Sequence, residues 1–212
     1  MNPISNSPAT LSRRSFMVGT SAMASGGFAL GLNVLGTSEV LAQATDTAPE
    51  VGIWVLVKPD DTCVIRIVRS EMGQGTRTGL AQLVAEEMEC DWRKVTTESP
   101  TPGQNLKRKR AWGDMSTGGS RGIRTSQDYV RRGGAVARTM LMQAAANEWS
   151  VAVSELTVAN SVITHAASGR KTTYGKVAAA AAQLPVPDAK TMVLKDPRNW
   201  KIAGKSIRRL DT

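Results

Sequence analysis

The chain has 212 residues and a formal net charge of +9 at pH 7. That length suffices for one domain with its own hydrophobic core, or for two small ones. The excess of Lys and Arg favours anionic ligands or an acidic partner surface. Two cysteines and one histidine exclude the Cys and His clusters of iron–sulfur and structural zinc sites, so we expect no metal site built from this chain's own side chains.

Residues 1–44 have the features of a twin-arginine (Tat) export signal. Arg13 and Arg14 precede a Gly/Ala-rich apolar stretch, and Leu41-Ala42-Gln43-Ala44 has the pattern of a small-x-small cleavage site. We predict cleavage after Ala44. The alternative is an uncleaved anchor helix, which the glycines of the stretch disfavour. The Tat route carries folded proteins, so the signal points to a protein that acquires a cofactor before export, and nucleic acid is not expected as a partner.

Two β-rich runs at 51–57 and 62–68 flank Lys58-Pro59-Asp60-Asp61, which predicts a hairpin. The hairpin leads into a glycine-framed turn at 70–78. Apolar residues then recur at spacings of three and four, which predicts an amphipathic helix from Thr76 to about residue 90. A short strand is expected at 94–98.

Pro100, Pro102 and Gly103 predict that the chain then breaks into a basic loop at 104–111. Its Lys107-Arg108-Lys109-Arg110 run is either solvated or a phosphate contact. A second glycine loop, residues 113–122, precedes a predicted helix at 126–149, for which residues 125–128 supply N-cap chemistry. Gly133-Gly134 inside this helix mark a close contact, either with another helix or with a cofactor loop.

A second hairpin is predicted from the runs 156–159 and 162–165, followed by an alanine-rich helix from residue 173 to 182. From Pro185 the chain is extended and is expected to dock on, or lead into, something else. We therefore predict an α+β fold with strand hairpins and three main helices packed on one side. The predicted domain covers 45–184, with an extended segment at 185–212.

His165 lies in a strand-like run and is predicted to be structural. Cys63 and Cys90 are either two buried free thiols or a disulfide, and the sequence leaves both readings open.

The two glycine loops are the candidate binding site. Glycine lets a ligand approach the main chain, and helix N-termini carry N–H groups without helical partners, so two such loops before two helices make a cradle for an anionic cofactor. The plain alternative is a pair of tight turns. The candidate residues are Met72, Gly73, Gln74 and Gly75 in one loop and Thr117, Gly118, Gly119, Ser120 and Arg121 in the other.

These motifs resemble the molybdopterin-binding large subunit of the xanthine dehydrogenase/aldehyde oxidase superfamily, above all exported members of the isoquinoline 1-oxidoreductase beta subunit and aldehyde dehydrogenase type. The resemblance rests on the export signal, on both glycine loops, on Thr78, Ala85, Glu86 and Glu87 after the first loop, and on four runs later in the chain. Those runs are Gly169-Arg170 to Tyr174-Gly175, Leu194-Lys195-Asp196, Ile202-Ala203-Gly204-Lys205 and Arg208-Arg209-Leu210-Asp211-Thr212.

The resemblance implies that Met72 to Gly75 contact one side of a molybdopterin cytosine dinucleotide carrying molybdenum, and that Thr117 to Arg121 contact the other side. The Gln74 amide would bond the pterin edge, while Ser120, Arg121 and the helix N-termini would face the phosphates. It also implies three partners: the remainder of the large subunit, an iron–sulfur small subunit that carries the [2Fe–2S] cluster, and a cytochrome c as a candidate electron acceptor.

No catalytic residue is expected in this chain. In the longer family enzymes the catalytic glutamate lies in a Gly-x-Gly-Glu motif, which is not present here. Glu71, Glu86 and Glu87 are expected to be solvated or capping. The resemblance thus implies an N-terminal portion or split subunit of a molybdenum hydroxylase that oxidises an aldehyde or N-heterocycle, with water as the oxygen source, and that does not turn over alone. The alternative is a non-catalytic exported binding module or a truncated relic. The expected location is the periplasm, either free or attached through partners to the inner membrane.

Overall fold

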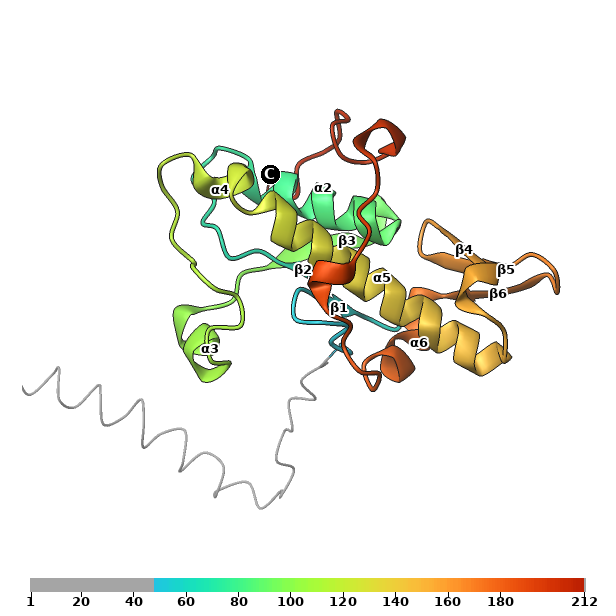
Figure 1. Ribbon diagram of the computed structural model, residues 1–212. Helices are drawn as coiled ribbons and strands as arrows, with labels where there is room; N and C mark the ends of the chain where they lie inside the picture. The colour runs from blue at the N-terminus through green and yellow to red at the C-terminus, as the bar shows by residue number, and fades with distance from the viewer. Residues whose placement is uncertain (1–47, 212) are drawn as a thin grey trace, which may run out of the picture. The chain divides into compact units, whose positions relative to one another are not determined.

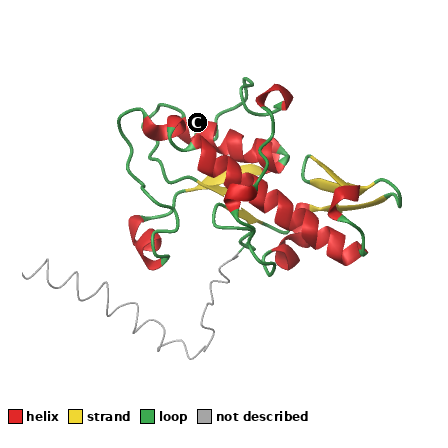
Figure 2. Ribbon diagram, in the orientation of Figure 1, coloured by secondary structure: helices red, strands yellow, loops and turns green. Residues whose placement is uncertain are grey.

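The computed structural model describes residues 48–211 (Figure 1). The predicted export signal and its cleavage site lie outside this range. The described chain contains two three-stranded sheets and several helices (Figure 2), so the predicted α+β class with α2, α5 and α6 as its main helices is confirmed. The elements are β1 (Val55–Val57), β2 (Cys63–Arg66), α2 (Thr76–Met88), β3 (Val95–Glu98), α3 (Pro102–Lys107), α4 (Arg121–Arg124), α5 (Gln127–Trp149), β4 (Leu156–Ala159), β5 (Val162–His165), β6 (Arg170–Thr173) and α6 (Tyr174–Ala181).

The first sheet has the strand order β1-β2-β3. Strands β1 and β2 form the predicted antiparallel hairpin, with Val55 opposite Ile65. Strand β3 runs parallel to β2, and because parallel neighbours need a crossover connection, α2 fills the link between them. The sheet therefore places the glycine turn at 70–75 directly between strand β2 and helix α2.

Helix α5 packs across α2, and Figure 1 shows it running in front of the first sheet. The contact is close at the predicted glycine pair. A Cβ atom on Gly134 would lie 2.7 Å from the carbonyl oxygen of Val84 in α2, and one on Gly133 would lie 2.4 Å from Cδ1 of Trp54. Gly134 thus serves the contact with another helix, while Gly133 packs against Trp54 before β1; neither meets the cofactor loop.

The second sheet has the order β4-β5-β6. The predicted hairpin β4-β5 is confirmed, but strand β6 was missed, because its run of charged and hydroxyl residues carries no apolar alternation. The ring of His165 bonds Ser168 and Glu155, at 2.7 and 3.0 Å, which agrees with its predicted structural role. Tyr174 begins α6, is fully buried, and donates its hydroxyl to the carbonyl of Met88.

The predicted basic loop at 104–111 is wrong in its first half, where the chain forms α3. Thr101 caps this helix: its hydroxyl accepts from Gln104 N at 3.2 Å, while the Gln104 side chain accepts from Thr101 N at 2.7 Å. Pro102 occupies the first helical turn, where its fixed φ favours a helix start and its missing N–H costs nothing. The proline read as a helix breaker is therefore a helix initiator.

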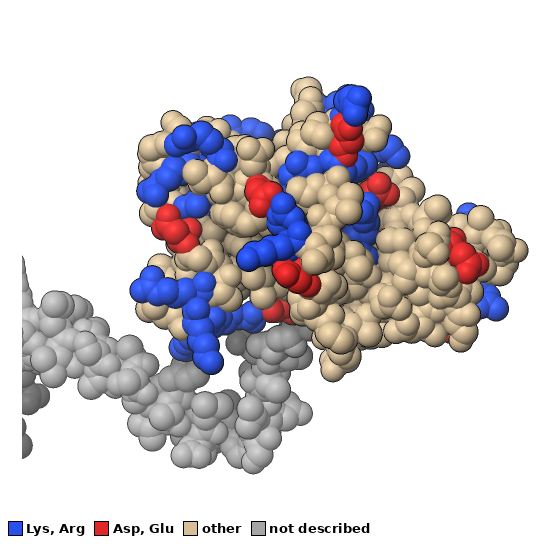
Figure 3. All heavy atoms as spheres, viewed as in Figure 1, with Lys and Arg blue, Asp and Glu red and all other residues tan. Residues whose placement is uncertain are grey.

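The run Lys107 to Arg110 divides into two roles. The Arg108 guanidinium binds both carboxylate oxygens of Glu50, at 2.7 and 2.8 Å, and lies 5.1 Å from the ring centroid of Trp112. The other three cations are exposed, and Figure 3 shows Lys and Arg side chains gathered over this part of the surface. One member of the run is thus structural.

The predicted N-cap of α5 is wrong as well. Ser126 precedes the helix but makes no side-chain cap. Its hydroxyl instead accepts from Arg69 Nε at 3.0 Å and from the Tyr129 hydroxyl at 2.7 Å. Because Arg69 is buried, its need for acceptors outweighs the cap.

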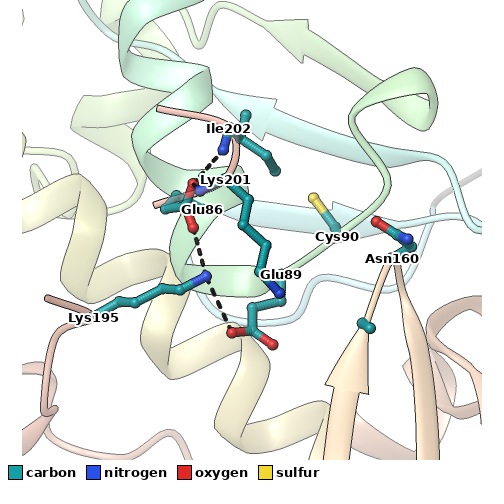
Figure 4. A pocket seen from close by; sticks show the side chains of 8 residues that line it. Glu86, Glu89, Cys90, Asn160, Lys195, Lys201 and Ile202 are labelled. Carbon is teal, nitrogen blue, oxygen red and sulfur yellow. Dashed lines mark hydrogen bonds and ion pairs between the residues drawn. The ribbon is translucent and has the colours of Figure 1, made fainter. Parts of the chain in front are cut away.

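The extended C-terminal segment docks on the chain's own helices, and this overturns the prediction for Glu86 and Glu87. Both carboxylates are buried, at 1% and 0% exposure, rather than solvated or capping. Glu86 accepts from Lys195 Nζ at 2.5 Å (Figure 4) and from the backbone N–H groups of residues 201–203. Glu87 accepts from Arg131 Nε at 2.8 Å and from Lys195 N at 3.0 Å. The outer face of α2 is therefore covered by the segment.

Cys63 and Cys90 are both free thiols and both buried. A hydrogen bond with Cys63 and the burial of the site both raise the pKa of the Cys90 thiol well above its usual value. The Cys90 thiol is therefore protonated and unreactive in the folded chain.

None of the helices within residues 48–211 combines the length and the apolar character needed to cross a membrane.

Candidate functional site

The two predicted glycine loops meet in space. Ser70 N, at the start of the first turn, donates to the Thr117 hydroxyl of the second loop at 2.8 Å. Behind them, α4 packs on the start of α2 so closely that a Cβ atom on Gly122 would lie 2.7 Å from Thr76 Oγ1. Tertiary packing thus places the two loops on the same face of the domain.

An open hollow of about 680 Å³ lies between these loops. Six of the nine predicted residues line it, and Gly73, Gly75 and Gly119 belong to the same loops without lining it. Five further lining residues were not predicted. They lie in the first turns of the helices that follow each loop, and this position is the signal that could have identified them. The lining residues are Met72, Gln74, Thr76, Thr117, Gly118, Ser120, Arg121, Gly122, Ile123, Arg124 and Gln127.

Glu71 closes the first turn on itself. Its carboxylate accepts from Gly73 N at 2.8 Å, Gly75 N at 2.9 Å and Arg77 N at 2.9 Å. Burial raises the pKa of Glu71, but these three backbone N–H bonds outweigh it and hold the pKa below its ordinary value. Glu71 was expected to be solvated or capping, and of the two it caps the turn and the start of α2. The N-terminus of α2, however, is already occupied by a carboxylate, so it is a poorer anion site than its glycines suggest.

The Gln74 amide is also used inside the turn. Its oxygen accepts from Met72 N at 2.6 Å, and its Nε2 donates to Ser70 O at 2.8 Å. One Nε2 hydrogen is left for a ligand. Gly73 and Gly75 have φ angles of 96° and 80°, in the left-handed region that glycine adopts without strain. The turn therefore presents mainly its backbone and the Met72 side chain, which is 72% exposed.

The second loop is more open. Among residues 48–211, no heavy atom lies within 4 Å of a Cβ placed on Gly118 or Gly119, apart from their own chain neighbours, so a ligand can approach this backbone directly. Arg121 donates to Ser116 Oγ at 2.8 Å, and Arg124 donates to Gly119 O at 3.2 Å. The two guanidinium groups add positive charge at the rim of the hollow.

Arg69 holds the second loop in place, and sequence reasoning missed it. This arginine is 5% exposed, follows β2, and donates both to Ser126 and to the carbonyl of Ser116. It also lies 3.5 Å from an Asp114 oxygen. A charged residue directly before a glycine turn gave no signal that distinguished it from the other arginines.

These residues fit an anionic ligand with a planar part. The second loop offers open glycine backbone and two arginines, and the first offers the exposed thioether of Met72. The misfit lies in the first turn and the start of α2, where the N–H groups of Gly73, Gly75 and Arg77 serve Glu71. Within residues 48–211, no group of three or more His, Cys, Asp or Glu residues is arranged to hold a metal ion.

An α+β domain with two glycine loops facing one basic hollow is typical of a binding domain for an anionic cofactor. The sequence profile of the molybdopterin cofactor-binding domain matches residues 13–203. The chain therefore belongs to the family of molybdopterin cofactor-binding domains, and the resemblance stated from its motifs is confirmed.

Two curated relatives are similar to the chain. The membrane-bound aldehyde dehydrogenase [pyrroloquinoline-quinone] of Gluconacetobacter polyoxogenes is 34% identical over 134 residues, which are 63% of this chain and 16% of that protein. Isoquinoline 1-oxidoreductase subunit beta of Brevundimonas diminuta is 36% identical over 149 residues, which are 66% of this chain and 19% of that protein. The chain thus spans less than a fifth of the length of these relatives.

Two solved structures are similar in part. Cu,Mo-CO dehydrogenase in its carbon monoxide reduced state is 20% identical, with a TM-score of 0.45, over 59% of this chain and 15% of that chain. Quinoline 2-oxidoreductase from Pseudomonas putida 86 is 16% identical, with a TM-score of 0.40, over 64% of this chain and 17% of that chain.

Proposed function

We propose that the loops at 70–75 and 113–121 hold a molybdopterin cofactor, and that the chain is the cofactor-binding portion of a molybdenum hydroxylase. The observation that carries the proposal is the bond from Ser70 to Thr117, which brings both loops to one open hollow. Family membership supports the ligand. Relatives named aldehyde dehydrogenase and isoquinoline 1-oxidoreductase support an aldehyde or an N-heterocycle as the substrate class.

The residues divide into two roles. Thr117 to Arg121, with Arg124, bind phosphate groups through open backbone and two guanidinium groups. Met72 to Gly75 contact the pterin, mainly through the Met72 side chain and the remaining N–H of Gln74, because the N–H groups of Gly73 and Gly75 already bond Glu71. When bound, the cofactor supplies the redox chemistry, and this chain's residues hold and orient it.

We also propose the finer assignments that the motifs imply. The cofactor is the cytosine dinucleotide form, water is the oxygen source, and electrons leave through a [2Fe–2S] subunit towards an acceptor such as a cytochrome c. The chain acts together with the remainder of a large subunit and does not turn over alone. The name of one relative as a subunit beta supports a multi-subunit assembly. The twin-arginine pattern at Arg13-Arg14 supports export to the periplasm.

The experiment is cofactor loading of the full chain in a host that makes molybdopterin. Bound pterin is measured by fluorescence after oxidative release, and molybdenum by mass spectrometry. Gly118→Val adds a side chain where the fold leaves space, so we expect unchanged thermal unfolding and a several-fold loss of pterin. Ala166→Val, in an exposed turn of the second sheet, is the matched control. A wild-type chain without pterin, or equal loading of Gly118→Val, would contradict the proposal and favour the non-catalytic module.

A further inference from the structure

A second hollow, of about 550 Å³, lies on a different part of the domain. It is bounded by β3, by the helical turn at Trp92–Lys94 before it, by the start of α2 and by the end of the described chain. Every charged residue that lines it is an arginine: Arg77, Arg93, Arg208 and Arg209. The hollow thus has a strongly positive lining that the cofactor site does not use.

Two of these arginines already have partners. Arg93 pairs with Asp91 at 2.8 Å, and Arg209 pairs with Asp211 at 2.5 Å. The other two do not: among the described residues Arg77 reaches only the Ser99 hydroxyl, at 3.5 Å, and Arg208 makes no ion pair with residues 48–211. Two positive charges at the hollow therefore have no carboxylate partner among residues 48–211.

The same hollow lies along an open sheet edge. Strand β3 pairs with β2 on one side only, because it is the last strand in the order β1-β2-β3. Ile67 N donates to Glu98 O at 2.9 Å, so the peptide groups of Glu98 face β2. Since these groups alternate along a strand, those of Thr97 face outward. An edge of this kind offers free N–H and C=O groups to an added strand.

We propose that the β3 edge binds an extended acidic segment of a partner polypeptide. The segment pairs with the backbone around Thr97 as an added strand, and it places carboxylates at Arg77 and Arg208. Trp92, which also lines the hollow, packs against an apolar side chain of the same segment. The open strand edge and the arginines have complementary roles, because backbone pairing supplies affinity and the arginines select acidic sequences. A small anion would use the arginines alone and would leave the strand edge unpaired.

The test uses the full chain and labelled peptides in fluorescence anisotropy. The first probe is a short peptide of alternating Glu and Val. One counterpart has Gln in place of Glu, which removes the charge, and another has an N-methylated backbone, which keeps the charge and removes the hydrogen-bond donors. We expect the wild-type chain to bind the first probe and to bind each counterpart at least about tenfold more weakly.

The matching variant is Arg77→Gln/Arg208→Gln, which is also expected to bind the Glu/Val peptide at least about tenfold more weakly. Lys171→Gln is the control, because it removes one exposed charge from β6, the edge strand of the other sheet. Thermal unfolding checks that the variants are folded, and the N-methylated peptide tests the proposal on the wild-type chain in any case. No binding of the Glu/Val peptide, equal binding of the N-methylated peptide, or an unaffected double variant would overturn it.

Discussion

Replacement of Glu86 by Gln tests how the C-terminal segment is held to the domain. The Glu86 carboxylate is 1% exposed and accepts from Lys195 Nζ and from three backbone N–H groups, at 2.5 to 3.1 Å. Breaking a buried ion pair costs roughly 3–5 kcal/mol of unfolding free energy. A Gln oxygen can keep part of the backbone contacts, and Lys195 keeps Glu89 at 3.2 Å, so we expect a loss of about 3 kcal/mol.

The assay is thermal unfolding of the full chain, together with limited proteolysis of the segment at 195–203. For a domain of this size, a loss of about 3 kcal/mol lowers Tm by roughly 6–12 °C, and the segment should become easier to cleave. Glu148→Gln is the matched control, since Glu148 is exposed on α5, and its effect should stay within about 0.5 kcal/mol. If Glu86→Gln is no more destabilising than this control, the reasoning about the buried carboxylate is refuted.

The difference in stability between wild type and Glu86→Gln should depend on pH with a definite sign. Burial raises the pKa of Glu86, but the bonds from Lys195 and the backbone outweigh it, so the folded-state pKa lies below its ordinary value of 4.5. A group with a lowered pKa contributes stability above its unfolded-state pKa and loses it as pH falls through the folded-state pKa. The stability gap between wild type and Glu86→Gln should be constant near neutral pH and should shrink below pH 4.5. A gap that widens on acidification would contradict the assignment.

Three further outcomes follow from the packing. Gly134→Ala would bring a Cβ to 2.7 Å from a carbonyl of helix α2 and should lower the unfolding free energy, measured with denaturant, by about 1–3 kcal/mol. The control is Gly103→Ala, whose Cβ meets no atom closer than 3.9 Å and which should be neutral or slightly stabilising. Equal effects of the two variants would count against the close helix contact. Tyr174→Phe leaves the buried Met88 carbonyl without its hydroxyl donor and should lower the unfolding free energy by about 1–3 kcal/mol, with an unchanged value as the contrary result. In the purified chain, Ellman's reagent should find both Cys63 and Cys90 only after denaturation, because both are free and buried; rapid reaction of the folded chain would disprove this burial.

Local sequence patterns determined most of the secondary structure. Period-two runs and a Pro-Asp turn predicted the β1-β2 hairpin, and apolar spacings of three and four predicted α2 and α5, because these signals depend only on neighbouring residues. Two of the failures, both at helix starts, have different origins, one local and one long-range. A proline can start a helix as well as end one, as Pro102 does, and a serine before a helix can be taken by another partner, as Arg69 takes Ser126.

The site was predicted from its glycine motifs, but its geometry was not. The sequence placed both loops before helices; the contact from Ser70 to Thr117 and the support from Arg69 depend on residues 47 and 57 positions apart. Glu71 lies inside the motif itself. Its carboxylate reaches the N–H groups at the start of α2 only because of the conformation that the turn adopts in the folded chain.

The buried carboxylates show most clearly what the tertiary structure alone decided. By composition, Glu86 and Glu87 belong on the solvent face of a helix. They are buried because a segment more than 100 residues further along covers them and supplies Lys195 and the backbone N–H groups of residues 201–203. The sequence determined the helix and the family, since both are encoded in short motifs. Long-range packing decided which faces of the helix are buried, because burial depends on which other segments of the chain cover each face.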